Sequence, residues 1–157
     1  MAPEAELYFQ AMENDNNGNF QWASINNMLN TGYSNGARTH TNSWGSESSS
    51  EWGVYTSSSE DVDDRARYYD QYYSGREGLT ILFAAGNDGP QSDTIGSPAT
   101  AKNLIAVGNS QNRYQGAPNS MMDGSSRGRV VDVRIKPDLV ARGGYVRSCM
   151  AQEACDK

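Results

Sequence analysis

Residues 79–85 (LTILFAA) form the strongest strand signal of the chain, and the turn Gly86-Asn87-Asp88-Gly89 follows them directly. A nearly continuous apolar run of this length is typical of a strand that is buried on both faces of a sheet. Such strands belong to parallel sheets, in which successive strands are joined by helices. The chain is therefore expected to supply helices and further strands around this one.

Segments upstream of this strand fit that expectation. Residues 5–12 predict a short buried strand, and residues 13–19 predict a turn rich in Asn, Asp and Gly. Across residues 20–33 apolar side chains recur at helical spacing, and Gly36 follows as a helix stop. Residues 37–42 predict a second strand. The apolar positions of the expected helix are Trp22, Ile25, Met28 and Leu29.

A second helix is expected to begin at Ser59 and to end at Gly75 or Gly78. Ser59 is a suitable N-cap, and the carboxylates of the first turns complement the positive end of the helix dipole. These carboxylates are Glu60, Asp61, Asp63 and Asp64, and the apolar face is Val62, Ala66, Tyr69 and Tyr73. Residues 103–107 and 136–141 predict further strands.

Strands that alternate with helices predict an α/β fold with a doubly wound, mostly parallel sheet. We expect residues 1–157 to form a single partial domain, with a βαβαβ part in residues 1–108 and a loop-rich part in residues 109–157. In such sheets ligands bind beyond the carboxyl ends of the strands. The loops at residues 42–45 and 86–89 follow two of the expected strands, so they should face the same crevice.

Several motifs resemble those of subtilisin-like serine proteases (subtilases, peptidase family S8), and they occur in that family's order. The most specific is Ala84-Ala85-Gly86-Asn87-Asp88-Gly89, which resembles the family's AAGN-x-G segment. The other matching segments are Met1-Ala2-Pro3-Glu4-Ala5, Asn42-Ser43-Trp44-Gly45, residues 97–108 (SPATAKN through VG), Ser125-Ser126-Arg127-Gly128 and Ile135-Lys136-Pro137-Asp138-Leu139-Val140-Ala141. The resemblance covers most of the chain. It implies an internal fragment of a catalytic domain, with a partial subtilisin-like fold.

The resemblance also implies roles for single residues. Asn87 would be the side-chain donor of an oxyanion hole, in a serine endopeptidase that works through an acyl-enzyme. The alternative for Asn87 is turn chemistry alone. Ser43, Trp44 and Gly45 resemble the strand edge that holds the substrate backbone, and Ala84, Ala85 and Gly86 resemble the opposite pocket wall. Trp44 would favour apolar substrates, or it is a plain core aromatic.

The family's His and Ser segments, of HGT and GTSMA type, are not found in this sequence. The Asp and His segments would precede Met1 and the Ser segment would follow Ala141, so we expect the chain alone to be inactive. His40 is expected to be a buried, hydrogen-bonded structural residue. Residues 124–128 match G-x-S-x-G, but no strand precedes them as a nucleophile elbow requires. Arg142 replaces the proline that is usual in the family.

The net charge of −6 argues against a nucleic-acid partner, and no apolar stretch is long enough to span a membrane. The polar, acidic composition suits a secreted protein. We expect no cofactor or metal, with structural calcium confined to the parent enzyme, because residues 13–18 only partly match a calcium loop. Cys149 and Cys155 are close enough for a disulfide, although incidental thiols are the simpler interpretation.

The expected partners are a polypeptide substrate and either missing flanking segments or a complementing chain. Self-association through exposed sheet edges is a further expectation. A different class of function stays open. The chain could be a catalytically dead α/β module that binds an extended peptide, or another chain, along residues 43–45.

Overall fold

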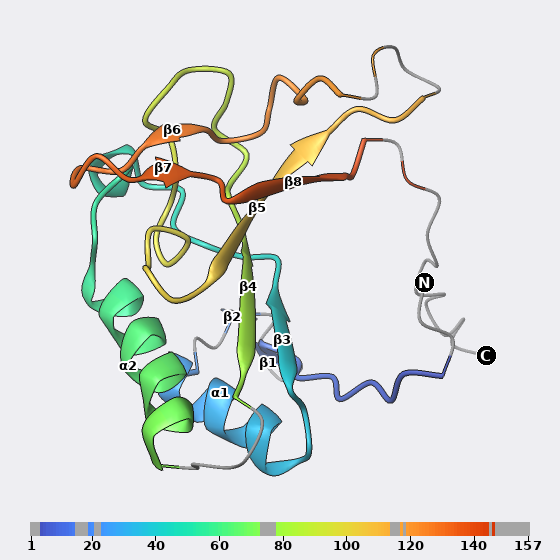
Figure 1. Cartoon of the computed structure of the whole chain (residues 1–157), viewed down its shortest axis with the longest axis vertical. Helices are drawn as coiled ribbons and strands as arrows, with labels where there is room; N and C mark the ends of the chain where they lie inside the picture. The colour runs from blue at the N-terminus through green and yellow to red at the C-terminus, as the bar shows by residue number, and fades with distance from the viewer. Residues whose placement is uncertain are drawn as a thin grey trace.

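The computed structural model describes residues 4–14, 19–20, 23–72, 78–113, 117, 119–144 and 146. Its main sheet has four parallel strands in the order β3-β4-β5-β8 (Figure 1). These strands are Thr39–Asn42, Thr80–Ala84, Ile105–Ser110 and Leu139–Arg142. Two short antiparallel pairs accompany the sheet: β1 (Glu13–Asn14) with β2 (Asn19–Phe20), and β6 (Gly128–Arg129) with β7 (Ile135–Lys136).

Both expected helices are present, as α1 (Ile25–Ser34) and α2 (Ser57–Tyr72), and a short 3₁₀ helix spans Ser49–Glu51. Gly36 ends α1 with a φ of 92°, a conformation that glycine adopts without a Cβ penalty. Trp22 lies outside the described residues. The parallel sheet with flanking helices confirms the α/β fold class.

The second helix begins two residues earlier than expected, because Ser59 is fully buried inside it. Its hydroxyl bonds to Thr100 Oγ1 (2.7 Å) and Ser97 Oγ (3.1 Å), so it joins the helix to a distant loop rather than capping it. Ala66 packs against the core as expected. The Tyr69 side chain, Tyr73 and Gly75 fall outside what the structure describes.

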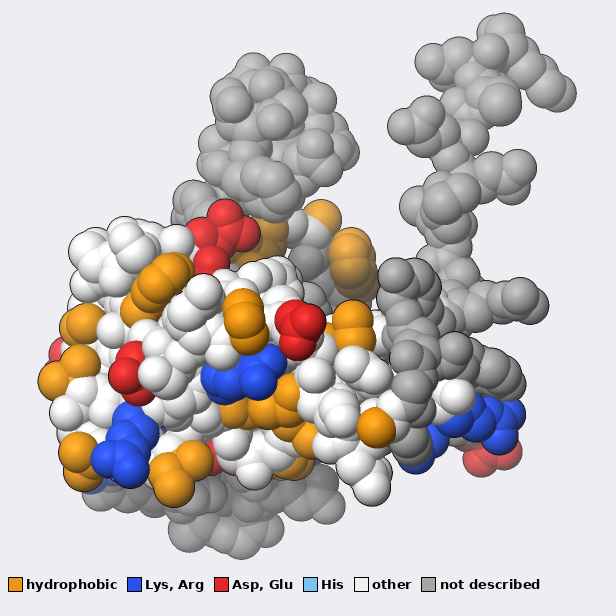
Figure 2. Space-filling view, turned by 90° about the horizontal axis from the view of Figure 1, so that it is seen from above, with side chains coloured by type: hydrophobic (Ala, Val, Ile, Leu, Met, Phe, Trp, Pro, Cys, Tyr) orange, Lys and Arg blue, Asp and Glu red, His pale blue; other side chains and the backbone are white. Residues whose placement is uncertain are grey.

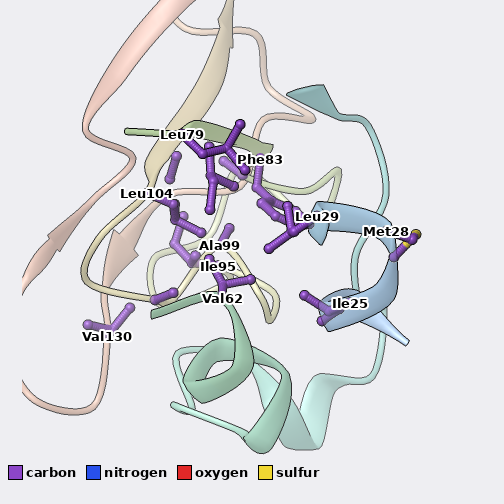
Figure 3. Close-up of a cluster of buried hydrophobic side chains, with 14 of the residues drawn as sticks. Ile25, Met28, Leu29, Val62, Leu79, Phe83, Ile95, Ala99, Leu104 and Val130 are labelled. Carbon is purple, nitrogen blue, oxygen red and sulfur yellow. The ribbon is translucent and has the colours of Figure 1, made fainter. Parts of the chain in front are cut away.

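The hydrophobic core lies between the two helices and the sheet (Figure 3). Its fully buried side chains include Leu29 from α1, Val62 from α2, and Ile81 and Phe83 from β4. The opposite face of β4 is less covered, since Thr80 and Ala84 are exposed. The strand is thus buried on one face rather than on two, because both described helices contribute to the same core.

Residues 5–12 do not form the expected strand. They pair with no other described segment, and Leu7 and Phe9 remain 90% and 81% exposed. An apolar run becomes a strand only where a sheet edge satisfies its backbone groups. Here the segment is held by a side chain instead, since Gln10 donates to the Met28 carbonyl at 3.2 Å.

The last strand, β8, begins at Leu139 rather than at residue 136. Lys136 pairs in the β6–β7 hairpin, and Pro137 has no N–H group for a ladder. Asp138 instead accepts the Ala106 N–H at 2.7 Å, which fixes the entry of β8 beside β5. No helix within the described residues is long and apolar enough to cross a membrane.

Candidate functional site

Two loops leave the sheet together at the carboxyl ends of β3 and β4. Asn42 is in register with Phe83, so the segments that follow these residues start at the same edge. A pocket of about 700 Å³ opens there. Its lining includes every residue to which the family resemblance assigned a catalytic or substrate-binding role: Ser43, Trp44, Gly45, Ala84, Ala85, Gly86 and Asn87. The prediction that both loops face one crevice is confirmed.

A third segment, residues 96–98, closes the pocket against the first loop. Ser46 donates its backbone N–H to the Ser97 carbonyl at 2.8 Å. The contact requires glycine, because a Cβ at Gly96 would stand 2.4 Å from the Ser46 carbonyl oxygen. The chain can therefore bring these two walls together only where side chains are missing.

The loop that carries Asn87 is fixed from below by the segment around Ser126. Asp88 donates its backbone N–H to Ser126 Oγ at 3.0 Å, and Ser126 donates its own N–H to the Gly86 carbonyl at 3.1 Å. Gly86 has a φ of 115°, and a Cβ there would lie 2.6 Å from Ser126 Oγ. Asn87 is exposed at the end of this rigid loop. Its amide can thus face the pocket without a large rearrangement of the backbone.

These contacts also show that residues 124–128, which match G-x-S-x-G, do not form a nucleophile elbow. Ser126 is fully buried, and its hydroxyl is engaged by the Asp88 N–H. A nucleophile elbow would instead present the serine hydroxyl at the surface, between a strand and a helix. Ser126 is a structural support of the Asn87 loop.

Trp44 both packs on the core and lines the pocket. Its ring packs edge-on against Phe83, with centroids 5.0 Å apart and planes at 77°, and its Nε1 donates to Asn42 Oδ1 at 3.2 Å. The side chain is only half-buried and also lines the pocket. The indole is therefore held in place by the core while part of it forms the pocket wall.

His40 has amide partners on both ring nitrogens. Nε2 lies 3.1 Å from Gln10 Oε1, and Nδ1 lies 3.0 Å from Asn42 Nδ2. Asn42 Oδ1 accepts from Trp44, so its amide nitrogen faces the ring and Nδ1 acts as the acceptor. Burial lowers the pKa of His40. The residue is a hydrogen-bonded structural histidine as expected, although it is half-buried rather than fully buried.

Sequence reasoning missed several residues of the pocket. Its lining also includes Glu47, Glu51, Ser58, Asp88 and Pro98. Glu51 lies in the 3₁₀ helix and Ser58 in the first turn of α2, and no motif links them to the glycine turns. Only tertiary packing brings these two segments to the pocket.

The described residues contain no cluster of three or more His, Cys, Asp or Glu side chains that could hold a metal ion. Residues 15–18 of the segment that partly matches a calcium loop lie outside the description. Cys149 and Cys155 lie outside it as well.

Comparison with known proteins decides the family. The model of the subtilase family, peptidase S8, matches residues 1–156. The chain belongs to the subtilase family. This subtilase is 38% identical over 68 residues to the serine protease AprX of Bacillus subtilis strain 168. The aligned segment covers 42% of the chain and 15% of AprX. It is 39% identical over 56 residues to a subtilisin of Bacillus sp. strain TA39, covering 36% of the chain and 13% of the subtilisin.

Solved structures show the same fold. Sphericase superimposes with a TM-score of 0.50 at 26% identity, over 76% of this chain and 36% of sphericase. The S41 psychrophilic protease superimposes with a TM-score of 0.50 at 25% identity, over 76% of this chain and 36% of the protease. The prenylagaramide maturation protease PagA gives 0.52 at 19% identity, over 80% of this chain and 39% of PagA, which supports the fold alone. The subtilase chain thus spans little more than a third of the solved proteins that it matches.

Proposed function

We propose that this chain is part of a serine endopeptidase and supplies its oxyanion-binding and substrate-binding loops. The observation that carries the proposal is the placement of Asn87 on a glycine-flanked loop, fixed by Ser126, at the rim of the pocket. A preorganised amide donor stabilises the negative charge that develops on the carbonyl oxygen during acyl transfer. Because the loop is already fixed, little reorganisation is needed when that charge appears.

The two walls of the pocket suit an extended peptide. Ser43 and Gly45 are exposed beside the pocket, so their backbone groups are accessible to a substrate strand. Pairing of backbone groups gives affinity without sequence preference, and pockets for alternate side chains add specificity. Ala84, Ala85 and Gly86 form the opposite wall, and their small size leaves room for one substrate side chain.

We further propose that the chain does not hydrolyse peptides by itself. A general base has to lie within hydrogen-bond reach of the serine hydroxyl that it activates. His40 is the one histidine of the sequence, and its ring nitrogens contact the amides of Gln10 and Asn42. The base and nucleophile of the active enzyme would come from other segments of the longer protein or from a complementing chain.

The first experiment is labelling of the purified chain with a fluorophosphonate, read by intact mass. Because the one histidine of the sequence is engaged by the amides of Gln10 and Asn42, we expect no adduct on the 157-residue chain. An active subtilisin, treated in parallel, serves as the positive control. An adduct on this chain would show an activated serine and would contradict the proposal of inactivity.

The proposal also covers the substrate, the partners, the location and the cofactors of the enzyme. The substrate is a polypeptide, and no nucleic acid or membrane takes part. Leu7 and Phe9 expose their apolar side chains, which supports the proposal that flanking segments of the longer protein cover them. Secretion is proposed from the acidic, polar composition. Neither a cofactor nor a metal is proposed for this chain, and any structural calcium would belong to the rest of the enzyme.

A second function fits the same exposed edge. A module without a catalytic centre could bind an extended peptide, or another chain, along residues 43–45, which lie at the pocket rim. Peptide binding without turnover, in a gene that lacks segments for Asp, His and Ser of the triad, would favour this function. A gene that encodes those segments on either side of the chain would favour the protease.

A further inference from the structure

Acidic residues from three different segments line the pocket. Glu47 follows β3, Glu51 ends the 3₁₀ helix, and Asp88 follows Asn87 in the loop after β4. The residues that line the pocket include no Lys, Arg or His. Viewed from above, the described surface of the molecule instead mixes acidic, basic and hydrophobic side chains (Figure 2). The lining of the pocket, with acidic and no basic residues, thus differs from the mixed surface in that view.

These pocket carboxylates differ from the carboxylates that support the fold. Asp63 and Asp93 accept hydrogen bonds from backbone N–H groups, and Asp138 pairs with Lys136 at 2.6 Å. Within the described part of the chain, no ion pair or side-chain hydrogen bond engages the carboxylates of Glu47 and Glu51. Both stay available to a ligand.

The rest of the wall is apolar or uncharged. The indole of Trp44 and the small residues Ala84 and Ala85 offer a surface for a methylene chain. A side chain that fits both parts has an apolar stem and a positively charged end. Lysine and arginine have this form, because they pack their stems on apolar surface and keep the charged group in water or beside an anion.

We infer that the pocket selects a lysine or arginine side chain of the substrate, which rests on the proposed function of the pocket as a substrate site. Glu47 and Glu51 are the specificity-determining residues. Trp44 contributes contact with the stem rather than a preference for purely apolar side chains. Acidic side chains are rejected by the same two carboxylates, since like charges repel at short range.

The test uses acetylated tetrapeptide amides that differ only in their last residue: lysine, norleucine or glutamate. Norleucine has an aliphatic chain of similar length without the charge. Binding to the full chain is followed by the amide NMR signals of residues 43–46 and 84–87. We expect the lysine peptide to bind roughly threefold to tenfold more tightly than the norleucine peptide, in line with two partly exposed ion pairs. The glutamate peptide should bind most weakly.

Variants assign the preference to the pocket. In the double variant E47Q/E51Q the advantage of lysine over norleucine should shrink, because Asp88 is then the one acidic residue left in the pocket lining. E60Q is the matched control, because Glu60 is exposed on α2 and does not line the pocket. It removes one negative charge and should keep the preference. High salt should reduce the lysine advantage in the unaltered chain, because the charges are partly exposed.

The outcomes distinguish a failure of the charge selection from a failure of the substrate site itself. Equal binding of the lysine and norleucine peptides at the pocket overturns the charge selection and leaves the substrate site intact. A lysine advantage that is undiminished in E47Q/E51Q also overturns the assignment to these residues. If no peptide shifts the signals of residues 43–46 and 84–87, the substrate site itself is wrong, and the selection fails with it.

Discussion

At the scale of single residues, His40 shows that the neighbours of a reactive side chain decide its role. Its imidazole is chemically able to act as a base, but Gln10 and Asn42 occupy both ring nitrogens. Asn42 in turn contacts Trp44 and the Leu82 carbonyl, so the ring is part of the support of the pocket wall. In this chain the histidine supports, through Asn42, the segment that carries Trp44 at the pocket.

The lowered pKa of His40 predicts a dependence of stability on pH. The unfolded chain takes up a proton near the ordinary pKa of about 6.5, while the folded chain resists protonation because the ring is buried. The contribution of neutral His40 to the free energy of unfolding is therefore complete above about pH 6.5. It is lost as the pH falls through the folded-state pKa. Since the ring is only half-buried, the loss of stability should be small.

Urea unfolding between about pH 5 and 7.5 measures this effect. The control is His40→Gln, which keeps a polar side chain without a titratable ring. No other histidine titrates in this range. If the stability of the original chain and of the variant changes with pH in the same way, His40 is not the cause.

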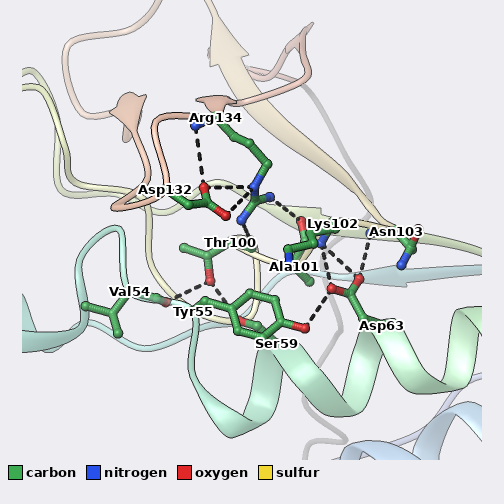
Figure 4. A network of polar contacts seen from close by, with 10 residues as sticks. All are labelled: Val54, Tyr55, Ser59, Asp63, Thr100, Ala101, Lys102, Asn103, Asp132 and Arg134. Carbon is green, nitrogen blue, oxygen red and sulfur yellow. Dashed lines mark hydrogen bonds and ion pairs between the residues drawn. The ribbon is translucent and has the colours of Figure 1, made fainter.

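At the scale of elements, Asp63 connects α2 to the loop that enters β5 (Figure 4). Its buried carboxylate accepts the backbone N–H groups of Lys102 at 2.9 Å and Asn103 at 2.6 Å. The Tyr55 hydroxyl donates to it at 2.9 Å. One side chain thereby fixes a helix against the start of a strand more than forty positions away, through backbone groups that would otherwise be unsatisfied.

We expect Asp63→Asn to lower the free energy of unfolding by about 2–4 kcal/mol, because an amide nitrogen would face donors in place of an anion. Burial, together with the bond to Asp63, raises the pKa of Tyr55 to about 12. The variant should move this pKa back toward 10, as followed by ultraviolet titration. Asp64→Asn is the control, since Asp64 is exposed on the same helix. An equal loss in both variants would mean that helix charge, not the Asp63 network, is responsible.

At the scale of the whole molecule, β3 and β8 are the outer strands of the main sheet. All four residues of β8 are exposed, and Leu139 and Val140 leave 46% and 45% of their surface accessible. An exposed, apolar edge strand is a template for pairing with another chain. The sheet is therefore poorly protected on the β8 side unless further polypeptide covers it.

We predict that the purified chain self-associates as its concentration rises, through the edge of β8. Val140→Lys should shift it toward the monomer, because a lysine on an edge strand opposes strand pairing. Light scattering coupled to size exclusion measures the change, and Val131→Lys is the control. Val131 is 76% exposed, but it lies in the turn between β6 and β7 rather than on the sheet edge. A monomer at all concentrations, or equal effects of both variants, would contradict the edge model.

The local patterns of the sequence determined the elements and their order. The continuous apolar run before Gly86 gave β4, helical spacing gave α1 and α2, and the glycine turns marked the two loops of the pocket. These features depend on residues that are close in the chain, so periodicity and turn chemistry are sufficient to predict them. The same motifs carried the resemblance to the subtilase family.

The tertiary structure decided what depends on contacts between distant residues. Residues 5–12 have the composition of a strand but pair with no strand among the described residues. Ser59 bonds across to Thr100, and Ser126 supports the loop of Asn87. Glu47 and Glu51 come to line the pocket only through the packing of the loops. Pairing, burial and charge at a site arise from segments that fold together, and no local pattern in the sequence encodes them.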